Sequence, residues 1–176
     1  MKKILLMLSL TPLFAFAQTT ANKKDDLQVY KDAEAHYLVS YPTSWIRRDQ
    51  KIPGHTNAIE FISPRHEGSL LIMTAQEGAN CKEVLTKLEN TRKLTNTLKP
   101  DQRAVSAAEL QSAHAQEGAR GQYEFASTEK TQSVEQHALC LRKGSVKQVL
   151  LGTFRKKNGP DALEAMLKSF SFQETH

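Results

Sequence analysis

The chain has 176 residues, of which 24% are charged, and its formal net charge is +5 at neutral pH. A nucleic-acid-binding protein would need clustered lysine and arginine with interleaved aromatic residues, so this mild charge leads us to expect no nucleic acid partner. The length suits one compact domain with a real hydrophobic core.

The N-terminal residues have the pattern of a secretory signal peptide. Two lysines precede a short apolar run, Ile4 to Phe16, and Ala15-Phe16-Ala17 fits the small-x-small rule for signal peptidase. We predict that residues 1–17 are removed before Gln18 and that the protein is periplasmic. An uncleaved N-terminal anchor is the alternative, although the run is shorter than the about 20 residues of a membrane span. No later stretch is long and apolar enough, so we expect no stable membrane insertion after cleavage.

Residues 18–26 are polar and charged without apolar periodicity, which predicts a flexible lead-in before a single domain over residues 27–176. Removing the 17 signal residues leaves 159 residues. The net charge falls from +5 to +3, because the signal carries two lysines and no acid. The mature protein is therefore mildly basic.

The chain has two cysteines, Cys81 and Cys140, and both survive signal cleavage. In an oxidising compartment an even pair is typical of one disulfide. A bridge across 59 residues stabilises the folded state by about 4 kcal/mol in the chain-entropy model. The alternative is a reactive thiol, but no Cys-x-x-Cys spacing exists and the compartment would oxidise a free pair.

The strongest strand signal lies in Tyr37 to Trp45. Large apolar residues alternate from Tyr37 to Tyr41, and Pro42 then ends backbone pairing because it has no N–H. Trp45 follows the turn, where its ring can fold back over the sheet. Together with the short strand Leu27 to Lys31, this stretch predicts an N-terminal hairpin.

The run Ile46 to Lys51 alternates poorly, and Pro53-Gly54 marks a loop. Strand pattern resumes over Ala58 to Ile62. Leu70 to Met73 then follow without a polar break, which predicts a central strand buried on both faces.

The clearest helical pattern covers Asn80 to Leu98. Apolar residues recur there at three and four positions, Asn80 and Glu83 make a capping-box-like start, and Pro100 follows the end. Cys81 lies in the first turn, so a bridge to Cys140 would pin this end of the helix to the sheet.

From Gln102 the pattern returns to strands, predicted over Val105 to Ala115, around Tyr123, and over Val134 to Leu141 and Val146 to Phe154. Lys143-Gly144 is a natural hairpin turn between the last two. On the earlier strand of this pair, Cys140 faces the side where we place the helix. A final helix opens at Asn158-Gly159-Pro160-Asp161, and Ser169 to Phe172 alternates like one more strand.

This order of elements resembles the PsbP-like family. The matching residues are Tyr37-x-Val39-x-Tyr41-Pro42-x-x-Trp45 near the start and Met166-Leu167-Lys168-Ser169-Phe170 at the end. The resemblance covers most of the mature chain in element order, and its motifs are packing motifs, so it supports fold rather than activity. It implies an α+β, PsbP-like α/β/α sandwich, with a twisted, mostly antiparallel β-sheet flanked by helices.

Members of that family are generally non-catalytic and bind other proteins. They include photosystem accessory subunits, a nuclear-transport regulator, the periplasmic DcrB-like group and cytoplasmic chaperones of secreted toxins. The signal peptide argues against the chaperone role and favours the DcrB-like periplasmic branch. No ligand residue is carried over from the family, and no cofactor is predicted.

The sequence also offers little chemistry of its own. His55 and His66 flank one predicted strand and could meet with Glu67, and His114 and His137 could meet across the sheet, but a metal site needs three or four convergent ligands. No Gly-x-Ser-x-Gly or glycine-rich phosphate loop occurs. We predict no catalytic and no metal residues, and keep a metal-dependent protein or enzyme as a second alternative.

Two basic clusters remain as candidates for binding. One is Arg47, Arg48 and Lys51, in a predicted loop that ends near His55; the other is Arg155 to Lys157. Either cluster alone is also explained by solvated charge. We prefer the first, because it adjoins an aromatic turn and a Pro-Gly loop. The prediction is an exported non-catalytic module that binds another protein; the alternative is a periplasmic immunity protein that neutralises a delivered toxin.

Overall fold

The structure is a computed structural model that describes residues 26–53, 55–91, 102–126, 133–155 and 161–173. The predicted signal peptide, nearly all of the lead-in, the end of the predicted long helix and the basic residues Lys156 and Lys157 lie outside these ranges. None of the helices within them has the length and apolar character needed to cross a membrane.

The described residues form ten strands and three helices. The strands are β1 (Leu27–Asp32), β2 (Tyr37–Pro42), β3 (Ile46–Gln50), β4 (His55–Ile62), β5 (Gly68–Ala75), β6 (Arg103–Ala104), β7 (Glu117–Ala126), β8 (Ser133–Lys143), β9 (Val146–Arg155) and β10 (Ser171–Phe172). The helices are α1 (Cys81–Thr91), α2 (Ala107–Ser112) and α3 (Asp161–Ser169).

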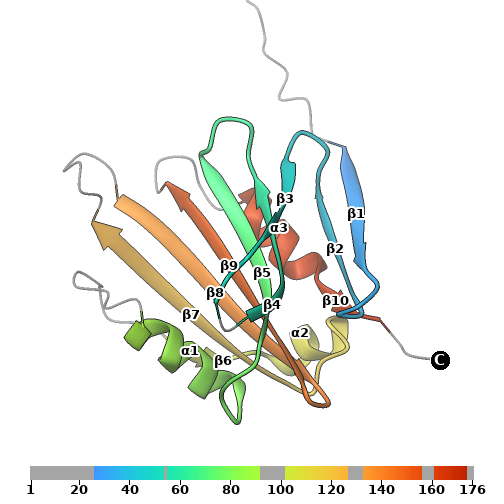
Figure 1. The fold of residues 1–176 in the computed structure, drawn as a ribbon, viewed down its shortest axis with the longest axis vertical. Helices are drawn as coiled ribbons and strands as arrows, with labels where there is room; N and C mark the ends of the chain where they lie inside the picture. Colours follow the sequence, from blue (N-terminus) through green and yellow to red (C-terminus); the bar gives the residue numbers. More distant parts are fainter. Residues whose placement is uncertain (1–25, 54, 92–101, 127–132, 156–160, 174–176) are drawn as a thin grey trace, which may run out of the picture.

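The strands are arranged in two sheets (Figure 1). Seven form a twisted antiparallel sheet in the order β3-β4-β5-β9-β8-β7-β6, and β1-β2-β10 form a small second sheet. Helix α1 packs on one face of the large sheet against β7 and β8, while α3 packs on the other face and against β2. The α+β class and the sheet flanked by helices are therefore confirmed.

Alternation along the strands divides the buried side chains between two cores. On β5, Leu70 and Ile72 point into the core shared with α3, and Met73 points into the core shared with α1. All three side chains are at most 1% exposed. This confirms the prediction of a central strand buried on both faces.

The two segments that carry the family resemblance contact each other in the larger core. The ring centroids of Tyr37 and Phe170 are 5.2 Å apart, and those of Tyr41 and Phe61 are 4.5 Å apart. Aromatic pairs of this kind add about 0.5–1.5 kcal/mol beyond the apolar area that they bury. Trp45 is half-buried and packs against the same core. The motif residues are thus packing residues.

The disulfide between Cys81 and Cys140 is present, with a Cα–Cα distance of 5.3 Å. It joins the first turn of α1 to β8, and both cysteines are fully buried. Cys140 faces the helix side of the sheet, as predicted. The bridge therefore fixes the beginning of α1 on the sheet.

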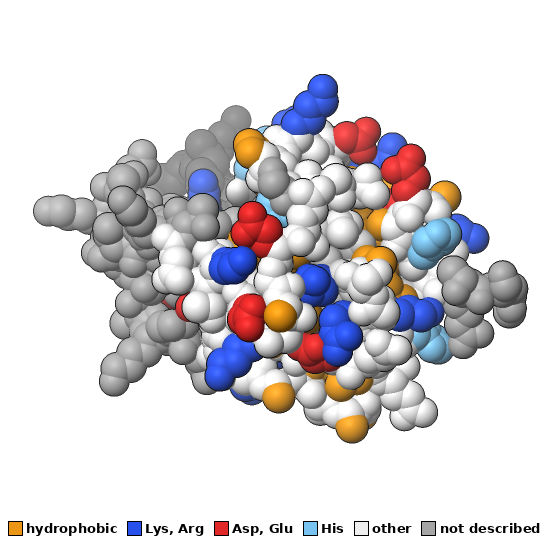
Figure 2. Space-filling model, turned by 60° about the horizontal axis from the view of Figure 1, so that its bottom comes forward, with side chains coloured by type: hydrophobic (Ala, Val, Ile, Leu, Met, Phe, Trp, Pro, Cys, Tyr) orange, Lys and Arg blue, Asp and Glu red, His pale blue; other side chains and the backbone are white. Residues whose placement is uncertain are grey.

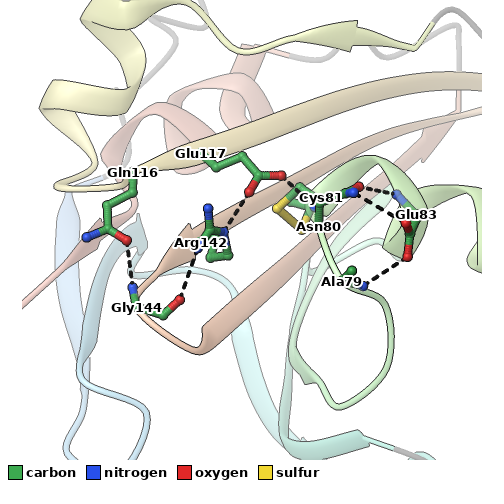
Figure 3. Close-up of polar contacts among 9 residues, drawn as sticks. Ala79, Asn80, Cys81, Glu83, Gln116, Glu117, Arg142 and Gly144 are labelled. Atoms are coloured by element: carbon green, nitrogen blue, oxygen red, sulfur yellow. Dashed lines mark hydrogen bonds and ion pairs between the residues drawn. A yellow bond between two sulfur atoms is a disulfide. The ribbon is translucent and has the colours of Figure 1, made fainter.

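Polar contacts fix the same helix end (Figure 3). The Cys81 N–H donates to Glu117 Oε1 at 2.9 Å, and Arg142 Nε donates to Glu117 Oε2 at 2.6 Å. Partial burial raises the pKa of Glu117, but the hydrogen bonds from Cys81 and Arg142 lower it further than burial raises it. Asn80 Oδ1 accepts from the Glu83 N–H at 2.9 Å, which confirms the predicted cap. The first N–H groups of α1 are therefore occupied by the protein's own carboxylate and amide.

The prediction of a strand over Val105 to Ala115 is wrong. Strand β6 ends at Ala104, before this range, and within the range the chain forms the short helix α2. Ser106 and Glu109 make a complete capping box, and the helix consists of residues such as alanine and glutamate that favour helices. The missed signal was this Ser-x-x-Glu spacing.

Candidate functional site

The predicted binding loop is largely a strand, which corrects the sequence interpretation. Residues Ile46–Gln50 form β3, the outermost strand of the large sheet, and among the described residues β3 pairs only with β4. Four of its five residues are exposed. A strand with water on both faces needs no alternation of apolar and polar residues, so its sequence carried no strand pattern.

The two arginines of β3 lie on opposite faces of the sheet, because neighbouring residues of a strand alternate. The Arg47 guanidinium lies 5.2 Å from the centre of the Tyr30 ring on β1, a cation–π contact. Arg48 lies opposite Glu60, whose carboxylate accepts a 2.7 Å hydrogen bond from Gln50. Neither arginine forms an ion pair within the described ranges.

An apolar hollow lies beside the end of this strand. It is a cavity of about 320 Å³ between the segment after β3, the strand β5 and the helix α1. Its lining residues include Ile52, Pro53, His55, Leu71, Met73, Val84 and Leu88. Lys87 and Glu77 line it as well, and their charged groups are 3.3 Å apart. The exposed basic strand is therefore continuous with an apolar depression.

The remaining predicted site residues lie next to this hollow. Lys51 follows the end of β3 and is exposed, without an ion pair to any described residue. His55 begins β4, and its Nδ1 lies 3.3 Å from the backbone oxygen of Thr74. The structure thus brings Arg47, Arg48, Lys51 and His55 to one edge of the sheet, although not into one pocket.

The histidine pairs considered from the sequence do not converge. His55 and His66 lie at opposite ends of β4, an eight-residue strand that spans roughly 25 Å. His114 is in the turn between α2 and β7, and the beginning of β7, Glu117, pairs with Arg142 of β8. His137 lies five residues further along β8 from Arg142, away from this turn. Within the described ranges no three histidine, cysteine, aspartate or glutamate side chains are placed to share a metal ion.

His137 instead joins α3 to the large sheet. Its Nδ1 lies 2.6 Å from Glu164 Oε1 on α3, and its Nε2 lies 2.9 Å from Glu135 Oε1 on β8. The hydrogen bond with Glu164 raises the pKa of His137, while burial opposes this and Glu135 adds to it. The same bond lowers the pKa of Glu164. No local sequence pattern predicts this contact, because the two residues are 27 positions apart.

Figure 2 shows basic and acidic side chains interspersed on the face of the molecule that it draws. The charges on that face are therefore not gathered by sign. Such a surface does not form the broad positive field that nucleic acid binding requires.

The chain has a PsbP-like α+β fold. Three solved structures share the arrangement. The PsbP protein (CyanoP) of Synechocystis sp. PCC 6803 has a TM-score of 0.53 at 12% identity, covering 89% of this chain and 98% of that protein. The Ran-binding protein Mog1p of Saccharomyces cerevisiae has a TM-score of 0.55 at 11% identity, covering 84% of this chain and 96% of Mog1p.

The third is a protein of Bacteroides thetaiotaomicron, with a TM-score of 0.56 at 13% identity. The match covers 84% of this chain but 48% of the Bacteroides protein, so the chain spans about half its length. No family model matches the sequence, and no curated protein matches it significantly. At these identities the likeness shows the fold and leaves the activity to be argued from the surface.

Proposed function

We propose that this protein is exported to the periplasm and acts as a non-catalytic module that docks onto another protein at strand β3. The observation that carries the proposal is the exposure of β3 on both faces at the edge of the large sheet. An edge strand offers unpaired backbone groups to an extended segment of a partner. Mog1p, which shares the fold, is a Ran-binding protein, and its binding of another protein agrees with this proposal.

The chemistry of the edge favours an acidic partner segment. Arg47, Arg48 and Lys51 have no described carboxylate as an ion-pair partner. The apolar hollow lined by Ile52 and Leu71 lies at the end of the strand and suits an apolar anchor residue. Exposed charges act mainly on association rate and specificity, so we expect the interaction to weaken with salt.

The test is affinity capture from periplasmic extract with the mature protein as bait. The double variant Arg47→Glu and Arg48→Glu should lose the partner, and raising the salt from about 0.1 M to 0.5 M should weaken its recovery. A matched control is Arg65→Glu with Lys82→Glu, which makes the same change in charge at exposed positions outside β3. A partner that both double variants retain, or both lose, would place the docking surface elsewhere.

The narrower hypothesis of an immunity protein stays a prediction, because no contact of the described residues favours it. A toxin gene beside the gene for this protein would support it. Inhibition of that toxin by the mature protein, and loss of inhibition in the Arg47 and Arg48 double variant, would then test it.

A further inference from the structure

A second hollow lies between α2 and α3, on the face of the large sheet opposite to α1. It consists of two adjoining cavities of about 300 and 280 Å³, which share the lining residues Arg120, Leu139 and Leu167. We call the two together the α2–α3 groove. It lies towards the β7–β6 edge of the sheet, whereas β3 forms the opposite edge.

The first cavity is lined mainly by apolar side chains, with Glu109, Arg120 and Lys168 also in its lining. Its floor is Leu139 and Leu141 of β8, and Phe170 lines it from the end of α3. From α2 it is lined by Ala108, Glu109 and Ser112, and the two short side chains, Ala108 and Ser112, lie one turn apart on the same side of the helix. No residue of α2 is buried, so the helix covers the apolar floor without filling the space above it.

The second cavity is polar and carries positive charge at the shared boundary. Arg120 Nη2 lies 2.7 Å from Glu109 Oε1, but its buried Nε has no acceptor among the described residues. A buried donor without an acceptor costs about 1–3 kcal/mol. Arg103 lines the same cavity, is exposed, and forms no ion pair with any described residue. An anionic group in the cavity would be attracted by both guanidinium groups, and the exposed Arg103 would donate to it.

The acidic groups of this region are already engaged. Glu164 lines the polar cavity but its carboxylate contacts His137, which also contacts Glu135. Glu109 contacts Arg120 and caps α2. Among the described residues, the positive charges of the groove without an ion-pair partner are therefore Arg103 in the polar cavity and Lys168 in the apolar cavity.

We propose that the α2–α3 groove binds an anionic amphiphile with a single acyl chain. The chain lies over Leu139 and Leu141, and the carboxylate or phosphate head contacts Arg103 and Arg120. The cavities, about 300 and 280 Å³, are of the size of small-ligand pockets. The site is independent of the docking surface on β3, so either proposal can fail alone.

The test is calorimetric titration of the mature protein with dodecanoate and dodecyl phosphate below their micelle concentrations. Both should bind with one-to-one stoichiometry, and dodecyltrimethylammonium should bind at least tenfold more weakly because its head is cationic. Inorganic phosphate alone should give no measurable heat, because the apolar chain contributes most of the affinity. The comparison of dodecyl phosphate with inorganic phosphate shows whether the groove binds an amphiphile or free phosphate.

Two variants, each with a matched control, locate the site. Ala108→Leu fills the apolar cavity and should weaken dodecanoate binding at least tenfold, while Ala107→Leu, an exposed neighbour that does not line the groove, should leave it unchanged. Arg103→Gln should weaken binding about tenfold, the loss of one charge-assisted contact. Arg65→Gln is the control for charge. All four positions are exposed or at the rim, so the variants should fold, and circular dichroism checks this.

Three results would overturn the proposal. One is the absence of dodecanoate binding by the wild-type protein. The second is equal affinity for dodecanoate and dodecyltrimethylammonium, or for dodecyl phosphate and inorganic phosphate. The third is equal affinity of the Ala108→Leu and Ala107→Leu variants for dodecanoate, since the chain would then lie elsewhere.

Discussion

Replacement of both Cys81 and Cys140 by alanine should strongly destabilise the protein. Cys81 and Cys140 are fully buried, one at the start of α1 and one in the middle of the large sheet. Alanine is the suitable replacement, because a serine hydroxyl buried there would need a hydrogen-bond partner. The exchange removes the bridge and leaves the packing of Val84 and Leu85 on the sheet in place.

The magnitude follows from the length of the closed loop. The bridge joins residues 59 positions apart, and the chain-entropy model assigns such a loop about 4 kcal/mol at 25 °C. Small domains are stable by about 5–15 kcal/mol, so the loss is a large share of the total. With a urea m-value of about 2 kcal/mol/M, the unfolding midpoint should fall by about 2 M.

Urea unfolding followed by two probes measures this loss. Trp45 is the only tryptophan, and it packs against the core on the α3 side, so its fluorescence reports the core distant from the bridge. Far-ultraviolet circular dichroism reports the helices and strands together. Coincident transitions with a loss of less than about 1 kcal/mol would refute the reasoning, and wild-type protein unfolded with a reductant should match the double variant.

Three further predictions concern single contacts. The Glu164–His137 contact raises the pKa of His137 and lowers the pKa of Glu164. The contact therefore stabilises the folded protein fully between the ordinary pKa values of the two groups, about 4.3 and 6.5. This stabilisation is lost as the pH rises through the raised pKa of His137 or falls through the lowered pKa of Glu164. Glu164→Gln should therefore cost about 1 kcal/mol at pH 5.5 and less at pH 9, measured by urea unfolding; an equal cost at both pH values would contradict this. Ser106→Ala removes the cap of α2 and should cost about 1 kcal/mol, with faster amide exchange confined to α2. Leu85→Ala empties a fully buried site under α1 and should cost about 2–5 kcal/mol in the same unfolding assay, and a loss below 1 kcal/mol would show that the site collapses.

Much of the fold could be predicted from local pattern. The apolar spacing at three and four residues located α1 and α3, and the alternation in Tyr37 to Tyr41 located β2. These signals are strong because one face of each element is buried and the other is not. The disulfide was expected from the predicted oxidising compartment and from an even number of cysteines.

The errors fell where local pattern is weak. Strand β3 has water on both faces, so its residues show no alternation and were interpreted as a loop. Helix α2 is short and has no buried residue, so it has no apolar stripe to show. In both elements the pairing or capping partner, and not the side-chain pattern, determines the structure.

The sequence by itself determined most of the helices and strands, although not β3 or α2, and it determined that one disulfide forms and the class of fold that the order of elements specifies. Only the tertiary structure decided that Arg47 and Arg48 lie on opposite faces of an edge strand, that Glu164 reaches His137, and that α2 stands over an apolar floor. The reason is physical. The periodicity of a sequence shows whether a side chain faces the core or water. It does not show which residues distant in the sequence lie next to one another, and a binding surface depends on these neighbours.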